Sequence, residues 1–109
     1  MSKQIEVGKN GERIIRIEIE ELERLELRFD LKGGELIGWG AKKDKPLPIG
    51  STLDKEKGIF YWALGPGFLG KHVLHFAVTD GNSYSPPLCV EINIKPKSYQ
   101  NGNKKEIER

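Results

Sequence analysis

The sequence contains one cysteine, Cys89, and no apolar run approaching the ~20 residues that a membrane-spanning helix needs. A lone cysteine excludes an internal disulfide framework and any zinc site built on several cysteines. An excess of charge of one sign is also missing, because 18 Lys and Arg stand against 16 Asp and Glu, for a formal net charge of +2. This balance argues against a dedicated nucleic-acid or membrane-surface binder, which would cluster basic residues.

What the sequence does contain is a repeated alternation of apolar and polar residues, in short runs separated by Gly, Pro, Asn and Asp. A period of two is typical of half-buried β-strands. Such runs occupy residues 5–7, 15–19, 25–29, 36–39, 59–62, 72–79 and 88–94. About seven short strands spaced by turns predict an all-β, antiparallel sandwich over residues 1–97.

Two segments do not fit the alternation. Residues 20–24 are rich in Glu, Leu and Arg, which are good helix formers, and Leu22 and Leu25 have helical spacing. The alternation on both sides, and the absence of an N-cap residue, favour two strands joined by a tight turn or bulge, with a helix as the alternative. Residues 98–109 carry only Tyr99 and Ile107 as large apolar groups and predict a polar tail or linker.

The alternation also predicts which side chains form the core. Phe60 and Trp62 are two residues apart on one strand, so both face inward, and Trp62 can fill the space between the two sheets. Leu53 is expected to close an end of the sandwich, where an irregular loop crosses between the sheets. The predicted core is completed by two residues of the strand over 72–79, Phe76 and Val78.

The second half of the chain carries an ordered series of motifs: LP at 47–48, LD at 53–54, GIFYW at 58–62, glycines at 67 and 70, TDG at 79–81 and VEINI at 90–94. In this order the motifs resemble the Ig domains and the dystroglycan-type cadherin-like domains of bacterial surface and secreted proteins. The resemblance implies an immunoglobulin-like or cadherin-like β-sandwich.

The resemblance also implies a non-catalytic function, as a structural spacer or an adhesion and protein-interaction unit of a larger exported bacterial protein. Its partners would be neighbouring domains of the same chain or another protein, with no nucleic acid and no membrane insertion. The location would be extracellular or at the cell surface, although no apolar stretch follows the first four residues to indicate a signal peptide. We further expect the two chain ends to lie at opposite ends of a stiff unit, as a tandem array requires.

Oxygen-bearing side chains near the predicted turns make calcium the one metal to consider, because Ca²⁺ needs six to eight oxygen ligands. The candidates are Asp30, Glu35, Asp54, Asp80 and Asn82. In calcium-binding relatives an acidic turn of the form Asp-x-Asp-Gly-Asp-x-Leu brings carboxylates together. Residues 30–36 correspond to that turn, but Lys32 and Gly34 replace two of its acidic positions. We therefore expect no cofactor, and at most weak calcium binding at Asp30 and Asp80.

Two aromatic residues suggest a second function. Tyr61 has the opposite parity to Phe60 and Trp62 and should point outward, and Trp39 is not needed in the core. Outward aromatic rings can stack on sugars, so the alternative is a carbohydrate-binding accessory module of a secreted hydrolase. An enzyme is not expected, because His72 and His75 should lie on opposite faces of their strand and no nucleophile has a base beside it.

Overall fold

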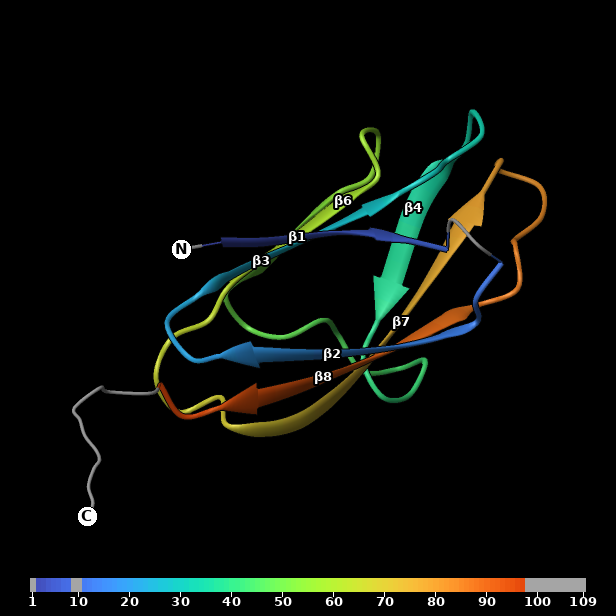
Figure 1. Ribbon diagram of the computed structural model, residues 1–109. Coiled ribbons are helices and arrows are strands. Elements are labelled where there is room, and N and C mark those ends of the chain that lie inside the picture. The colour runs from blue at the N-terminus through green and yellow to red at the C-terminus, as the bar shows by residue number, and fades with distance from the viewer. Residues whose placement is uncertain (1, 9–10, 98–109) are drawn as a thin grey trace, which may run out of the picture.

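The computed structural model describes residues 2–8 and 11–97 (Figure 1). Within these residues it contains eight strands and no helix: β1 (Ser2–Val7), β2 (Ile14–Glu20), β3 (Arg24–Phe29), β4 (Glu35–Trp39), β5 (Ser51–Asp54), β6 (Ile59–Ala63), β7 (Gly70–Thr79) and β8 (Leu88–Lys95). The all-β prediction is confirmed. The predicted tail, residues 98–109, lies outside the described residues, and the described part has no helix that could span a membrane.

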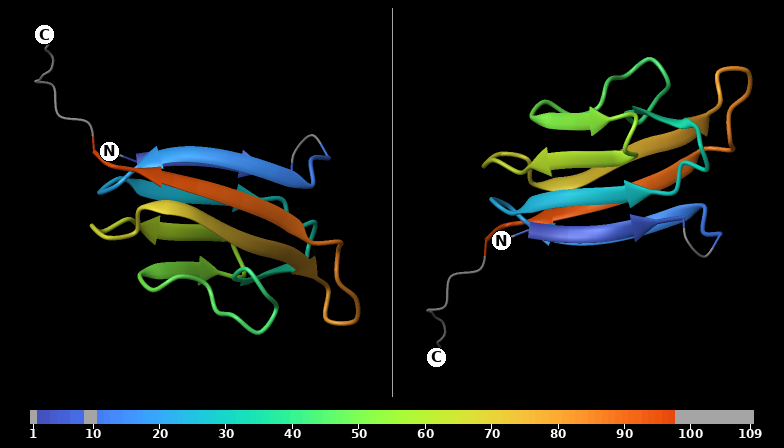
Figure 2. Two further views of the ribbon diagram at one scale, coloured as in Figure 1. Left: turned by 90° about the horizontal axis from the view of Figure 1, so that it is seen from below. Right: turned by 90° about the horizontal axis from the view of Figure 1, so that it is seen from above.

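The strands form two four-stranded sheets that face each other as the layers of a sandwich (Figure 2). The order is β1-β3-β6-β5 in the first sheet and β2-β8-β7-β4 in the second. The eighth strand, absent from the sequence prediction, is β5, which begins at Ser51 just after the prolines of its loop. Proline has no backbone N–H, so the loop with Pro46 and Pro48 is poorly suited to strand pairing. The residues of β5 lie beyond Pro48 and carry the N–H groups that pairing with β6 requires.

The prediction of a wholly antiparallel sandwich is wrong at one edge of each sheet. β1 runs parallel to β3, and β2 runs parallel to β8. The cause is that β1, β2 and β3 belong alternately to the first, second and first sheets. The chain reverses direction at each crossing, so β1 and β3 meet side by side with the same direction.

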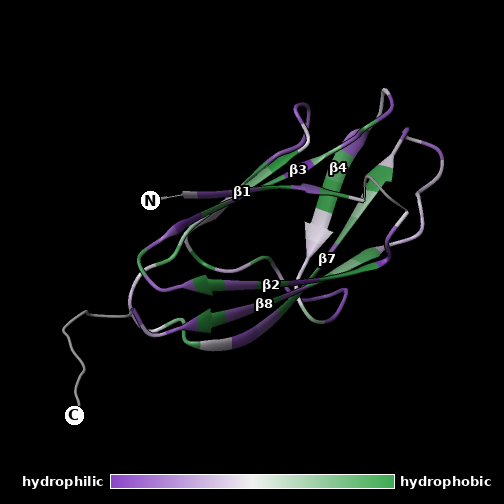
Figure 3. Ribbon diagram, in the orientation of Figure 1, coloured by the Kyte–Doolittle hydropathy of each residue, from purple (hydrophilic) through white to green (hydrophobic). Residues whose placement is uncertain are grey.

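Every second residue of a strand points inward, and these side chains fill the space between the two sheets. Figure 3 shows the resulting alternation of hydrophobic and hydrophilic residues along the strands. Phe60 and Phe76 are fully buried with ring centroids 5.2 Å apart, and Trp62 is 1% exposed. These three core predictions are confirmed. Leu53 and Val78 are partly buried and pack against this core.

The segment between β2 and β3 is a tight turn, and its helical alternative is wrong. The Glu23 amide donates to the Glu20 carbonyl oxygen at 3.3 Å, and Leu22 has a φ of 70°, in the left-handed region. The Leu22 amide in turn donates to the Leu64 carbonyl oxygen at 2.8 Å. Tertiary pairing of the strands thus overrides the helix propensity of this segment.

Both ends of the described chain lie at the same end of the sandwich (Figure 1), which we call the proximal end. Ser2 is paired with Arg24 at the start of β3, and the backbone amide of Glu21 donates to the Lys95 carbonyl oxygen at 2.9 Å. The expectation of chain ends at opposite ends is therefore wrong. Strands that alternate in direction return to the starting end when their number is even, and the unforeseen β5 makes it even.

Candidate functional site

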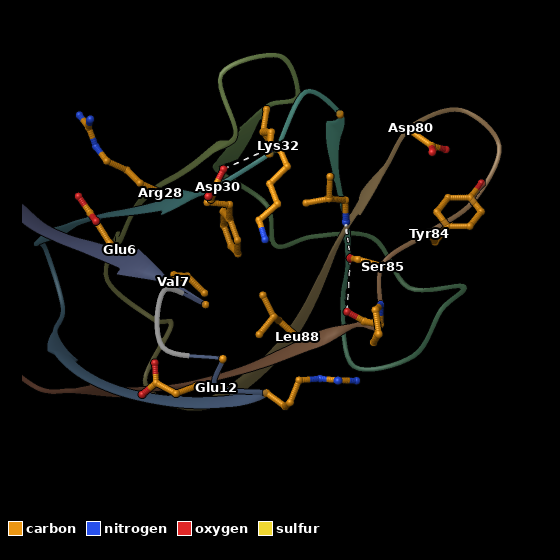
Figure 4. Close-up of a pocket in the computed structure, with 18 of the residues that line it drawn as sticks. Glu6, Val7, Glu12, Arg28, Asp30, Lys32, Asp80, Tyr84, Ser85 and Leu88 are labelled. Carbon is orange, nitrogen blue, oxygen red and sulfur yellow. Dashed lines mark hydrogen bonds between the residues drawn. The ribbon is translucent and has the colours of Figure 1, made fainter.

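A hollow of about 950 Å³ opens at the other end of the sandwich, which we call the distal end. Described residues just after β1 and just before β2 line it, together with the β3–β4 and β7–β8 connections (Figure 4). Its size is within the range of ordinary ligand sites. We call it the distal hollow, and its described lining residues are Glu6, Val7, Gly8, Gly11, Glu12, Arg13, Arg28, Phe29, Asp30, Leu31, Lys32, Gly34, Val78, Asp80, Ser83, Tyr84, Ser85, Pro86 and Leu88.

The floor of the distal hollow is apolar because it is the uncovered end of the core. Val7 and Phe29, the last residues of β1 and β3, are buried there. Leu31, Val78 and Leu88 are partly buried and pack against the same core. The surface that Leu31, Val78 and Leu88 leave exposed among the described residues can be covered by a ligand.

The β3–β4 connection holds Lys32 in an unusual backbone conformation. The Gly34 amide donates to the Leu31 carbonyl oxygen at 2.9 Å, and both central residues have positive φ, 48° at Lys32 and 86° at Gly33. These values describe a type I′ turn, which normally favours Asn, Asp or Gly at both positions. Asp30 supports the turn, because its Oδ1 accepts from the Lys32 amide at 3.1 Å.

The β7–β8 connection is organised by Asp80. Its Oδ1 accepts hydrogen bonds from the backbone amides of Asn82 and Ser83, each at 2.9 Å, and these bonds lower the pKa of the Asp80 carboxyl. A lowered pKa in the folded state stabilises the fold above the carboxyl's ordinary pKa, and this contribution is lost as the pH falls through the lowered value. Tyr84 follows on the rim of the hollow, with 67% of its surface exposed.

Asp30 and Asp80, the predicted calcium candidates, both line the distal hollow, on two different turns. Each uses Oδ1 to hold the backbone of its own turn. Asp54 does the same for the amide of Lys57, at 3.0 Å, outside the hollow. Among residues 2–8 and 11–97, no group of three or more His, Cys, Asp or Glu side chains is placed to hold a metal ion.

Calcium should therefore have little effect on stability. We expect millimolar CaCl₂ to change the melting temperature by less than about 1 °C, because two separated carboxylates supply too few oxygen ligands. Differential scanning fluorimetry with CaCl₂, and with EDTA as the control, measures this. A rise of several degrees that EDTA reverses would show that a calcium site forms.

The two aromatic candidates lie on opposite outer faces of the sandwich and cannot bind one ligand together. Tyr61 lies on the outer face of the first sheet, paired with Glu26 of β3 and 37% exposed. Trp39 lies on the outer face of the second sheet, stacked on His75 with ring centroids 5.7 Å apart and an interplanar angle of 12°. The Lys43 ammonium lies 5.6 Å from the centre of the Trp39 ring.

The two histidines face opposite sides of β7, as the sequence predicted. His72 points inward, where its ring meets that of Trp62 at a centroid distance of 5.3 Å. His75 points outward, and its Nδ1 lies 2.8 Å from the Gly40 carbonyl oxygen. The strand therefore separates the two imidazole groups.

No protein-family model matches this chain, and no curated protein matches its sequence. Among solved structures, the chain is similar to a variant of an endo-fucoidan hydrolase from glycoside hydrolase family 107. The TM-score is 0.52 at 12% sequence identity, over 79% of this chain and 13% of that chain. At this identity the similarity concerns the fold alone. The chain thus corresponds in fold to a small part of a much longer protein.

Proposed function

We propose that this chain is an immunoglobulin-like or cadherin-like module that binds a partner without catalysis, as part of a larger exported bacterial protein. One observation carries the proposal: both chain ends lie at the proximal end, and the distal hollow lies at the other. A module attached in this way holds its hollow away from the rest of the protein, where a partner can reach it.

The strand order supports the immunoglobulin-like assignment. In that fold, strands A, B, E and D form one sheet, and C, F and G form the other. The order β1-β3-β6-β5 corresponds to the first, and β4-β7-β8 to the second, with β2 as an added edge strand beside β8. The parallel pairing of β1 with β3 is a departure from the usual antiparallel arrangement.

The position of the chain ends favours interaction over an in-line spacer. In a linear tandem array, the preceding domain attaches at one end of a module and the following domain attaches at the opposite end. Here a preceding and a following domain would both adjoin the proximal end, at Ser2 and Lys97, so the module would project sideways. Insertion as a side branch is the arrangement that such closely placed ends permit.

Immobilisation in two orientations tests the proposal. In a Cys89→Ala background, one version is tethered through a cysteine at position 97 and the other through a cysteine at position 82, beside the distal hollow. Each is probed with an array of soluble peptides. We expect binding with the first version and a loss of at least tenfold with the second, because the tether obstructs the hollow. Equal binding in both orientations, or none in either, would contradict the proposal.

A carbohydrate-binding accessory module is the second candidate, and Trp39 is the observation that favours it. Its ring is half-buried on the outer face of the second sheet, where it stacks on His75 and has the Lys43 ammonium over it, so a sugar ring would stack there by displacing the flexible Lys43 side chain. The solved structure of similar fold is, by its name, a fucoidan hydrolase. Retention on insoluble polysaccharide that Trp39→Ala abolishes and Tyr61→Ala preserves would support this candidate, and no retention would remove it.

A further inference from the structure

We propose that the distal hollow binds the carboxylate of an apolar organic acid, such as the last residue of a peptide with a large aliphatic side chain. The Lys32 ammonium is the partner of the carboxylate, and the apolar floor takes the aliphatic group. This inference rests on the proposed function, since it names a ligand class for the same site.

The Lys32 side chain extends over the floor of the hollow. Figure 4 shows it running from its turn down into the hollow, in the direction of Val7 and Leu88. Within residues 2–8 and 11–97 its ammonium forms no hydrogen bond or ion pair, whereas Lys71 and Lys95 each pair with a glutamate. An ammonium beside apolar surface, with no protein anion in contact, attracts an anion from solution.

The other charged residues of the lining are placed to compete less for a ligand. Asp30 and Asp80 each hold the amides of their own turn, so one oxygen of each is already used. Figure 4 shows Glu6, Glu12 and Arg28 directed away from the centre of the hollow, and the Arg28 Nε donates to a carboxylate oxygen of Glu26. Arg13 adds a second cation to the lining. The centre is therefore occupied by a cation above an apolar surface.

The apolar floor indicates that the ligand carries an aliphatic group in addition to its carboxylate. Leu31, Val78 and Leu88 are only partly buried, and Tyr84 stands on the rim with most of its ring exposed. Covering such surface with an aliphatic group is favourable, at roughly 25 cal/mol for each Å² removed from water. A ligand that carries both an aliphatic group and a carboxylate satisfies the floor and Lys32 together, which a simple inorganic anion does not.

The backbone at Lys32 supplies a test that separates binding from folding. Lysine is disfavoured at a φ of 48°, and asparagine is preferred at this position of a type I′ turn. Lys32→Asn should therefore raise the melting temperature, by about 4 °C, while it removes the charge. A residue with only a structural role would not gain stability and lose binding in the same substitution.

The probes are N-acetyl-leucyl-leucine, the same dipeptide as its C-terminal amide, and octanoate, each titrated into the full chain and followed by ¹⁵N NMR. We expect the dipeptide acid to bind about fivefold more tightly than the amide, with shifts at Val7, Leu31 and Leu88. Octanoate distinguishes the source: binding as tight as the dipeptide's indicates a fatty-acid type of ligand, and weaker binding indicates a peptide.

Lys32→Asn should abolish the difference between acid and amide, while Lys57→Asn, which removes an equal charge from a neighbouring distal turn outside the hollow, should keep it. Equal affinity for acid and amide in the unsubstituted chain, or shifts outside the hollow, would overturn the inference. If these probes fail while the orientation dependence on the peptide array holds, the ligand class is wrong and the proposed function stands.

Discussion

Trp62→Ala is expected to destabilise the fold by about 4 kcal/mol, a large share of the total stability of a domain of this size. The Trp62 ring is 1% exposed and makes edge-on contacts with Phe68 and His72, at centroid distances of 5.6 and 5.3 Å. Its removal leaves a cavity between the two sheets, which the neighbouring strands cannot close. Urea unfolding followed by circular dichroism measures the loss.

The adjacent residue on the same strand provides the matched control. Tyr61 points to the outer face and is 37% exposed, so Tyr61→Ala should cost less than about 1 kcal/mol. The contrast between positions 61 and 62 depends only on which side of β6 each residue faces. Similar losses at the two positions would mean that the inward and outward faces of β6 have been assigned wrongly.

Gly58→Ala is expected to cost about 3 kcal/mol, because two independent penalties meet at this turn. Gly58 has a φ of 72°, which alanine disfavours, and a Cβ there would lie 2.7 Å from the Leu31 Cγ and 2.9 Å from the Phe29 carbonyl oxygen. The Gly58 carbonyl oxygen also accepts from the Phe29 amide at 2.8 Å, so the turn cannot move away without loss of that bond.

Gly11→Ala isolates the backbone part of this cost. Gly11 has a φ of 78°, close to that of Gly58, but a Cβ there meets no atom within 4 Å. We expect Gly11→Ala to cost about 1 kcal/mol, the penalty of positive φ alone. Thermal unfolding of the two variants gives the difference, and a cost at Gly58 no larger than at Gly11 would refute the close packing of the turn against β3.

The sequence was sufficient for the layers and the core but not for the topology. Alternation places Phe60, Trp62 and Phe76 inward without knowledge of their partners, because the side-chain period of a strand is local. The pairing direction of β1 and β2 depends on which sheet each strand enters, and nothing local specifies that. β5 was missed because its four residues follow a proline-rich loop and carry only one inward aliphatic residue, Leu53.

The candidate site was predictable only in fragments. Asp30 and Asp80 were identified individually as turn residues, but their common position around one hollow follows from the strand order. In the sequence, Lys32 stands out only as a basic residue in place of an acidic one within the turn over residues 30–36. Its orientation depends on a type I′ turn, and the only local signal was the glycine pair that follows it. The position of Tyr84 could not be predicted from the alternation of apolar and polar residues, because Tyr84 lies in the connection between β7 and β8 and not in a strand.

The opposed positions of the chain ends and the distal hollow are the central claim, and distances between spin labels test it most directly. In a Cys89→Ala background, labels are placed at positions 2 and 97 in one variant and at 2 and 82 in another. The ten residues of β7 span about 33 Å, so we expect the 2–82 distance to exceed the 2–97 distance by about 15 Å. A 2–97 distance equal to or longer than the 2–82 distance would contradict the arrangement and the function proposed from it.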